Sequence, residues 1–109
     1  MAQFDVHRNK GALREAIPFV VLVQSAQFDG YRRRVVVPLV RRSMLPAHTP
    51  TVGRRMNPEF HVDGIDVVLH PLDMVSVAVD QLGAHIGSLA EHGPRIADAL
   101  DELLSRSWG

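Results

Sequence analysis

The first 90 residues of the chain consist of short apolar runs separated by turn residues. Apolar and polar residues alternate in Gln3–His7 (QFDVH), which predicts a half-buried strand. Pro18–Gln24 (PFVVLVQ) is a continuous β-branched run, typical of a strand that is covered on both faces. Arg33–Leu39 (RRVVVPL) predicts a further strand, in which Pro38 indicates a sheet edge or a bulge because proline lacks the backbone N–H. Alternation returns in Met74–Asp80 and predicts one more strand.

Turn residues mark how some of these strands are connected. The clearest signal is Asp63-Gly64, a favoured pair for a type I′ turn, which lies between the predicted strands Phe60–Val62 and Ile65–Leu69. A second pair, Asp29-Gly30, predicts that Phe28 lies in or beside a loop. The first of these signals defines a β-hairpin.

Three segments have no clear strand pattern. Lys10–Glu15 is predicted to be a loop. Residues 41–58 are rich in proline and basic residues, and they predict a long irregular excursion. Gly83–Ala90 is ambiguous between strand and helix, because its two glycines weaken a helix there.

The period of the pattern changes after Pro94. Ile96, Leu100, Leu103 and Leu104 follow the i, i+4, i+7, i+8 spacing of one helix face, and Pro94 suits the first turn of that helix. Five or six short strands followed by one terminal helix predict a mainly β fold, a small and strongly bent sheet or barrel against which the helix packs. With 109 residues, the chain is predicted to form a single domain over 1–109.

Composition excludes several classes of protein. No apolar run approaches the length needed to span a bilayer, and the chain does not begin like an export signal. Cysteine is absent, which excludes disulfides and thiol chemistry and agrees with a reducing compartment. We therefore expect a cytoplasmic protein that has no membrane partner.

Charge is balanced overall but unevenly placed along the chain. Residues 1–56 hold ten Lys and Arg against three Asp and Glu, whereas residues 57–109 hold two against nine. This asymmetry indicates either a surface for nucleic acid or a partner of opposite charge, or else two halves that neutralise each other on folding. The sequence leaves both interpretations open.

Candidate catalytic chemistry is sparse. The six histidines show no metal-binding spacing and no cysteine supports a zinc site, so we expect neither a metal nor a cofactor. Arg32, Arg33 and Arg34 open a predicted strand, and alternation would place Arg32 and Arg34 on one face of it. Such a cluster supports RNA cleavage when an acid or base stands beside it, but no acid–base pair lies at a defined spacing here.

The ordered series of segments resembles a known family. QFDVH, FVVLVQS, RRRVVVPL, FHVDGIDVVLHPLDMVSVAV and a helix followed by Trp-Gly are similar to the CcdB toxins of bacterial toxin–antitoxin pairs. The most specific stretch is VQS followed by a basic cluster and VxPL, and LDMVSV is the next most specific. The resemblance spans nearly the whole chain.

This resemblance implies a fold, a function and a set of partners. The fold would be an SH3-like small antiparallel barrel of the CcdB/MazF type, mainly β with a C-terminal α-helix. The protein would be a homodimer without catalytic activity that binds the A subunit of DNA gyrase and traps the enzyme on cleaved DNA. A cognate antitoxin with a disordered acidic tail would neutralise it, and the pair would repress its own operon, with DNA bound only through the antitoxin.

The same resemblance implies which residues meet each partner. Gyrase would contact Trp108 and Gly109 and, in the loop after VQS, Gln27 and Phe28, where the family has adjacent isoleucines. The antitoxin would bind the basic cluster Arg32, Arg33 and Arg34. For the dimer interface, Val35, Val37 and Leu104 are predicted from the residues themselves, because a barrel this small leaves apolar surface on the strand Val35–Leu39 and on the helix for a partner.

Two features keep alternatives open. By helical spacing, Trp108 extends the stripe of Leu100 and Leu104, which predicts a buried residue, whereas the polar stretch Ser105–Ser107 and the resemblance favour an exposed gyrase contact. The arginine-rich segments also fit a MazF-type endoribonuclease of the same fold. The altered residues around Trp108 fit a CcdB-like protein that has lost gyrase poisoning.

Overall fold

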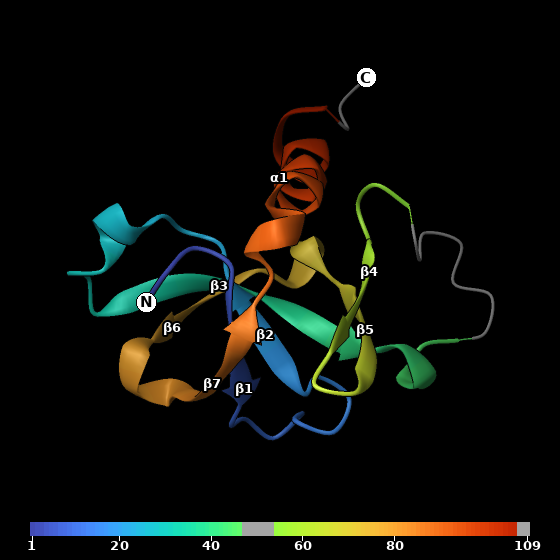
Figure 1. Cartoon of the computed structure of the whole chain (residues 1–109), viewed down its shortest axis with the longest axis horizontal. Coiled ribbons are helices and arrows are strands. Elements are labelled where there is room, and N and C mark those ends of the chain that lie inside the picture. The colour runs from blue at the N-terminus through green and yellow to red at the C-terminus, as the bar shows by residue number, and fades with distance from the viewer. Residues whose placement is uncertain (47–53, 107–109) are drawn as a thin grey trace.

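The computed structural model describes residues 1–46 and 54–106 of the chain. Within these residues, an antiparallel sheet of seven strands carries one α-helix near its C-terminal end (Figure 1). In chain order the elements are β1 (Asp5–Asn9), β2 (Phe19–Leu22), β3 (Arg33–Arg41), β4 (Glu59–Val62), β5 (Ile65–Leu69), β6 (Val75–Ala78), β7 (Leu82–Ser88) and α1 (Gly93–Asp101). The predicted mainly β fold with a C-terminal helix is confirmed, and the sheet bends into a half-barrel.

Strand β3 lies at the centre of the sheet, which runs β4-β5-β3-β2-β1-β7. Its first half pairs with β6 and its second half with β5, and β2 pairs along its other side. The prediction that Pro38 marks a sheet edge or a bulge is therefore wrong, because β3 is a central strand and its register with β2 is continuous through Pro38. Pro38 lies where β3 changes partner, after the Val36–Val75 pair and before the Leu39–Leu69 pair, so its missing N–H leaves no ladder bond broken. Its carbonyl accepts a hydrogen bond from the His70 N–H at 3.0 Å.

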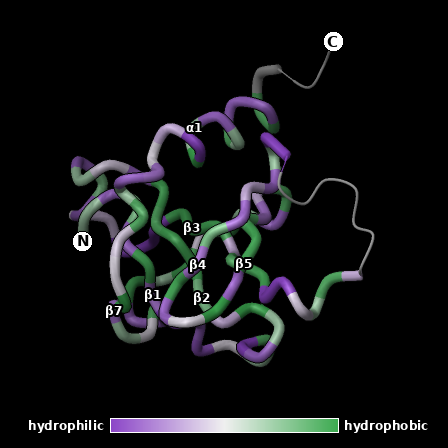
Figure 2. The backbone as a smooth tube through the Cα atoms, turned by 45° about the vertical axis from the view of Figure 1, so that its right-hand side comes forward, coloured by the Kyte–Doolittle hydropathy of each residue, from purple (hydrophilic) through white to green (hydrophobic). Residues whose placement is uncertain are grey.

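The hydrophobic core lies between the concave side of this sheet and α1. Apolar residues gather in the central strands β2, β3 and β5, whereas α1 is largely hydrophilic on its outer side (Figure 2). From α1, Ile96 and Ala99 enter the core and are fully buried. The remaining core residues come from the strands and the segment before the helix: Val6, Phe19, Val21, Val37, Leu39, Phe60, Val62, Val67, Leu69 and Leu89.

Phe4 connects the start of the sheet to the start of the helix. Its N–H donates to the Leu22 carbonyl at 2.6 Å, and its carbonyl accepts from the Leu89 N–H at 2.9 Å. These bonds hold Phe4 at a positive φ of 70°, and its ring lies against Gly93, where a Cβ would come within 2.8 Å of Phe4 Cε2. Glycine at position 93 therefore lets α1 approach the sheet closely.

The predicted hairpin and turn are confirmed. Strands β4 and β5 pair on either side of Asp63 and Gly64, whose φ angles of 48° and 80° are the positive values that a type I′ turn requires. The ambiguous segment Gly83–Ala90 is mostly strand, because β7 pairs with β1 through a register that shifts twice. Irregular pairing of this kind is common at sheet edges, where β7 lies.

The predicted helical stripe is confirmed only in its first half. Ile96 is buried and Leu100 packs partly against the core. Of the other two leucines, Leu103 is half-buried, but Leu104 is 69% exposed. After Asp101 the helix widens into a π turn (η6, Glu102–Arg106). A π turn holds more residues than an α turn, so Leu104, which lies within it, leaves the face that the α period predicts.

Some of the uneven charge is neutralised between the two halves of the chain. Arg8 pairs with Asp63 at 3.2 Å, Arg42 pairs with Glu59 at 3.1 Å, and Arg55 lies 3.6 Å from Asp98.

Among the residues that the structure describes, no helix has the length and apolar character to cross a membrane.

Candidate functional site

The segment between β2 and β3 forms an ordered loop, residues 24–31, that projects from one end of the sheet (Figure 1). It contains a 3₁₀ turn (η1, Ala26–Phe28), whose backbone bonds continue as Tyr31 N–H to the Phe28 carbonyl at 3.1 Å. Gln27 is exposed and Phe28 is half-buried, with its ring centroid 5.8 Å from that of the exposed Tyr31. The loop predicted to hold Phe28 thus presents two adjacent aromatic rings.

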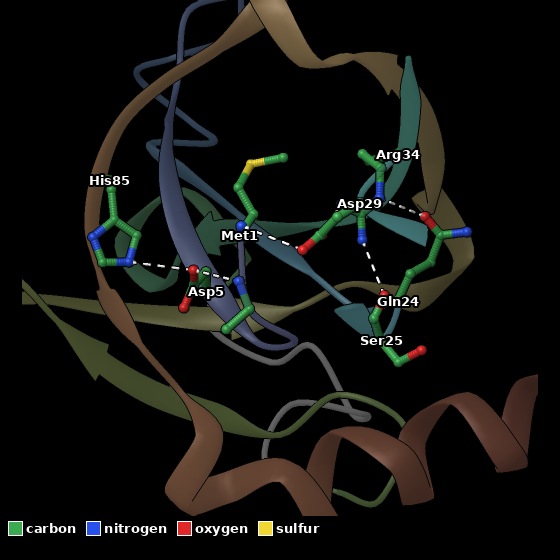
Figure 3. Close-up of polar contacts among 8 residues, drawn as sticks. Met1, Asp5, Gln24, Ser25, Asp29, Arg34 and His85 are labelled. Carbon is green, nitrogen blue, oxygen red and sulfur yellow. Dashed lines mark hydrogen bonds and ion pairs between the residues drawn. The ribbon is translucent and has the colours of Figure 1, made fainter. Parts of the chain in front are cut away.

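Arg34, at the start of β3, reaches back to this loop from inside the protein. Its side chain has no solvent exposure, and each nitrogen of its guanidinium donates to a different residue (Figure 3). Nη1 donates to Asp29 Oδ1 at 2.6 Å, Nε to Gln24 Oε1 at 3.2 Å and Nη2 to the Ser25 carbonyl at 3.3 Å. Arg34 was predicted to bind the antitoxin together with Arg32 and Arg33, but its side chain is buried and its donors are satisfied internally.

Asp29 is the acidic residue at the centre of this arrangement. Its second carboxylate oxygen lies 3.6 Å from the amino group of Met1 (Figure 3). The hydrogen bond from Arg34, with a smaller contribution from the Met1 amino group, holds the pKa of the Asp29 carboxyl below its usual range. Gln24 completes the arrangement, since its Oε1 also accepts from the Val35 N–H at 3.0 Å.

The other two arginines of the basic cluster remain at the surface. Arg32 and Arg33 are both exposed, and neither forms an ion pair with the described residues. Arg33 bends along β6, where its Nε donates to Ser76 Oγ at 3.0 Å and its Nη2 to the Ser76 carbonyl at 2.6 Å. Arg33 and Lys10 line a groove of about 330 Å³ that no acidic side chain lines.

This basic groove continues into an apolar one of about 250 Å³. The two grooves share four lining residues, Asn9, Gly11, Val77 and Gln81. The apolar groove lies on the face of the sheet opposite the core, and its floor is formed by side chains of β2, β3 and β6, namely Val20, Val36, Pro38 and Val75. An apolar floor flanked by two cations suits an acidic segment that also carries apolar side chains.

The residues predicted for a dimer interface occupy three different environments. Val35 is half-buried and Leu104 is exposed, so both side chains reach the surface of the chain. Val37 has no exposure, because it packs in the core against α1 and the strands. The structure therefore corrects the assignment of Val37 to an interface.

Histidines form isolated pairs with carboxylates elsewhere. The Nδ1 atoms of His61 and His70 lie 2.8 Å from Asp66 and 3.1 Å from Asp73. Within residues 1–46 and 54–106, no group of three or more such side chains has a geometry that could hold a metal ion.

Two predicted gyrase contacts, Trp108 and Gly109, lie outside the described residues. Sequence reasoning missed two residues of the loop. The Asp29-Gly30 pair predicts only a turn for Asp29, although Asp29 is the sole acidic residue between Glu15 and Glu59, within a basic segment. Tyr31 directly follows the Asp29-Gly30 turn. Its spacing of three residues from Phe28 is the signal in the sequence that could have indicated the contact between the two rings.

Comparisons with known proteins identify the family and the fold of this chain. The sequence matches the family described as CcdB protein over residues 3–105, and no curated protein matches the chain. Among solved structures, the Mycobacterium tuberculosis toxin MazF-mt6 is similar with a TM-score of 0.70 and 16% identity, over 95% of this chain and 99% of that one. That likeness shows a shared fold. Because the family match covers nearly the whole chain, the protein belongs to the CcdB family, the toxins of toxin–antitoxin systems.

Proposed function

We propose that this protein is a non-enzymatic toxin that binds the A subunit of DNA gyrase and traps the cleaved gyrase–DNA complex. The observation that carries the proposal is the family match over residues 3–105. Trp108 and Gly109 would form one part of the contact, and the 24–31 loop with Gln27 and Phe28 would form the other. The loop supports this role because it carries an aromatic pair on an internally fixed backbone, and aromatic residues dominate protein-binding hot spots.

The antitoxin would bind the basic groove and its apolar continuation. Arg33 and Lys10 supply positive charge beside apolar side chains, and Arg32 is exposed near Arg33 at the start of β3. A disordered acidic tail would gain charge-assisted hydrogen bonds there while burying its own apolar side chains. Arg34 has no part in this contact, since it is buried. DNA would be bound only through the antitoxin, when the pair represses its operon.

The protein would act as a homodimer. Val35 and Leu104 are the two predicted interface residues whose side chains reach the surface, where a second copy of the chain would cover them. A twofold dimer would present each gyrase contact twice to a symmetric target.

The endoribonuclease alternative receives less support. RNA cleavage by the arginine cluster would need an acid or base beside an exposed guanidinium. Arg34 and its carboxylate partner Asp29 are bound to each other, and Arg33 donates to Ser76 rather than lying beside a titratable side chain. The fold that this chain shares with the toxin MazF-mt6 does not by itself carry an activity.

Two assays run in parallel test the proposal. Purified protein added to gyrase and supercoiled DNA is expected to accumulate cleaved DNA, and the same protein is expected to leave single-stranded RNA intact. RNA cleavage without DNA cleavage would establish the endoribonuclease alternative. Activity in neither assay, together with tight binding of an antitoxin, would identify a family member that has lost gyrase poisoning.

A further inference from the structure

We propose that Arg34 is a positioning residue, an internal anchor that holds the 24–31 loop in the conformation that presents Gln27 and Phe28 to the target. This inference rests on the proposed function, because it assumes that the loop contacts gyrase. It assigns to the third arginine of the basic cluster a role that differs from those of its two exposed neighbours.

The contacts of Arg34 lie on both sides of the presented residues. Gln24 and Ser25 precede the 3₁₀ turn that contains Gln27 and Phe28, and Asp29 follows it directly (Figure 3). One guanidinium therefore fixes the two ends of the turn at once. The planar guanidinium of arginine can hold both ends of the turn because its N–H donors point in fixed directions.

Burial makes this connection hard to break. A guanidinium that is shielded from water needs a counter-charge and acceptors for its N–H groups. Asp29 is its carboxylate partner, and Gln24 and Ser25 supply the neutral acceptors. Movement of the loop away from β3 would leave the Arg34 charge buried without its carboxylate partner. The loop is therefore held in one conformation in the unbound protein.

Preorganisation of this kind matters for binding. A loop that is already ordered loses less conformational freedom on association, and affinity rises accordingly. Gln27 is exposed and makes no side-chain hydrogen bond within the described residues. The ring centroids of Phe28 and Tyr31 lie 5.8 Å apart, so the anchor fixes the backbone while leaving these side chains available.

The test uses the full chain and three variants. Asp29→Asn removes the counter-charge but keeps the shape of the side chain. The double variant Asp29→Asn with Arg34→Met also removes the buried charge, and the loss of both charges restores stability that the single change costs. Asp63→Asn is the matched control, because Asp63 pairs with Arg8 in an exposed position and asparagine tolerates its positive φ.

Two measurements separate anchoring from stability. Hydrogen exchange of the Phe28 and Tyr31 amides is expected to accelerate at least tenfold in the single and the double variant, with amides of β5 unchanged in the double variant. The dissociation constant for the gyrase A subunit is expected to rise at least tenfold in both, and to stay unchanged in Asp63→Asn. A double variant that is stable but binds poorly would show that Arg34 acts through the loop.

Unchanged exchange in the loop would overturn the inference, as would faster exchange with unchanged gyrase affinity. A Phe28→Ala variant that binds gyrase as well as the wild type does would also overturn it, because the loop would then not be a contact. A wild-type chain that does not bind gyrase would instead overturn the proposed function, and the exchange rates would still decide whether Arg34 anchors the loop.

Discussion

Arg34 has no solvent exposure, whereas the side chain of Asp29, which accepts its hydrogen bond at 2.6 Å, is 39% exposed. The pair therefore has one end inside the protein and one end that protons can reach. Arginine keeps its charge at all accessible pH values, so the titration of this pair is that of Asp29 alone. The electrostatic hold on the loop thus depends on the ionised carboxylate.

The first prediction concerns pH. The hydrogen bond from Arg34 lowers the pKa of Asp29 in the folded state below the value of about 3.9 for an unfolded chain. The stabilisation from the ionised carboxylate is therefore complete above that value and is lost as the pH falls through the lower, folded pKa. Urea unfolding of the wild type and Asp29→Asn is expected to show a constant difference in unfolding free energy above about pH 5 that shrinks in more acidic solution. A difference that does not change with pH would contradict this account.

The second prediction concerns the contact between Phe4 and Gly93. Gly93→Ala places a Cβ within 2.8 Å of a ring that two backbone hydrogen bonds hold in place, so the helix or the ring must shift. The unfolding free energy is expected to fall by about 1–3 kcal/mol, the range for overpacking. Gly87→Ala is the control, since nothing lies within 4 Å of a Cβ there, and it is expected to change stability by less than about 0.5 kcal/mol. Thermal unfolding of both variants checks the difference.

Local patterns in the sequence predicted much of the fold. The Asp63-Gly64 turn and the buried run in β2 carry their signal within a few residues, and both are confirmed. Pro38 misled because its effect depends on which strand lies beside it, and β3 changes partner at that residue. Leu104 left the predicted stripe because one π turn alters the helical period, which residue spacing does not reveal.

The candidate site was less predictable than the fold. Strand alternation placed Arg32 and Arg34 on one face, and it could not show that a loop folds back and buries one of them. That burial depends on Asp29, whose position relative to Arg34 is set by the 3₁₀ turn between β2 and β3. The family resemblance supplied partners, but it did not distinguish an exposed arginine from an anchoring one.

The third prediction concerns assembly. Light scattering is expected to find a dimer at micromolar concentration. Leu104→Asp places a charge on an exposed apolar site of the proposed interface and is expected to weaken dimerisation at least tenfold, because a buried unpaired charge is unfavourable. Met44→Asp changes another exposed apolar residue, in the 3₁₀ turn Arg42–Met44, and is expected to leave the dimer intact. A monomeric wild type would contradict the prediction.

The fourth prediction concerns the exposed part of the basic cluster. Arg33→Ala is expected to weaken binding of the antitoxin about ten- to hundredfold, the equivalent of one charge-assisted hydrogen bond. The loss is expected to diminish as salt is added, since Arg33 is exposed. Arg54→Ala removes an exposed arginine that does not line the groove and serves as the control. RNA hydrolysis that disappears in Arg33→Ala would instead support the endoribonuclease alternative.

The last prediction concerns Trp108, the only tryptophan of the chain. The described part of the helix departs from its apolar face at Leu104, so regular helical spacing gives no reason to expect the Trp108 side chain in the core. We therefore expect an exposed indole that binds gyrase, where tryptophan offers the strongest cation–π face to an arginine. Trp108→Ala is expected to change the unfolding free energy by less than about 1 kcal/mol while abolishing growth inhibition in cells.

Antitoxin binding supplies the control for this variant, because the proposed groove is formed by β1, β3 and β6 and does not involve the helix end. Trp108→Ala is expected to bind the antitoxin as the wild type does, whereas Arg33→Ala is expected to bind the antitoxin more weakly and to keep its toxicity. Intrinsic fluorescence gives an independent measurement, since all tryptophan emission comes from one residue. Red-shifted emission that a soluble quencher reaches agrees with exposure. Blue-shifted, protected emission together with a stability loss of about 3–5 kcal/mol in Trp108→Ala would show that the indole is buried, and the gyrase contact would then have to lie elsewhere.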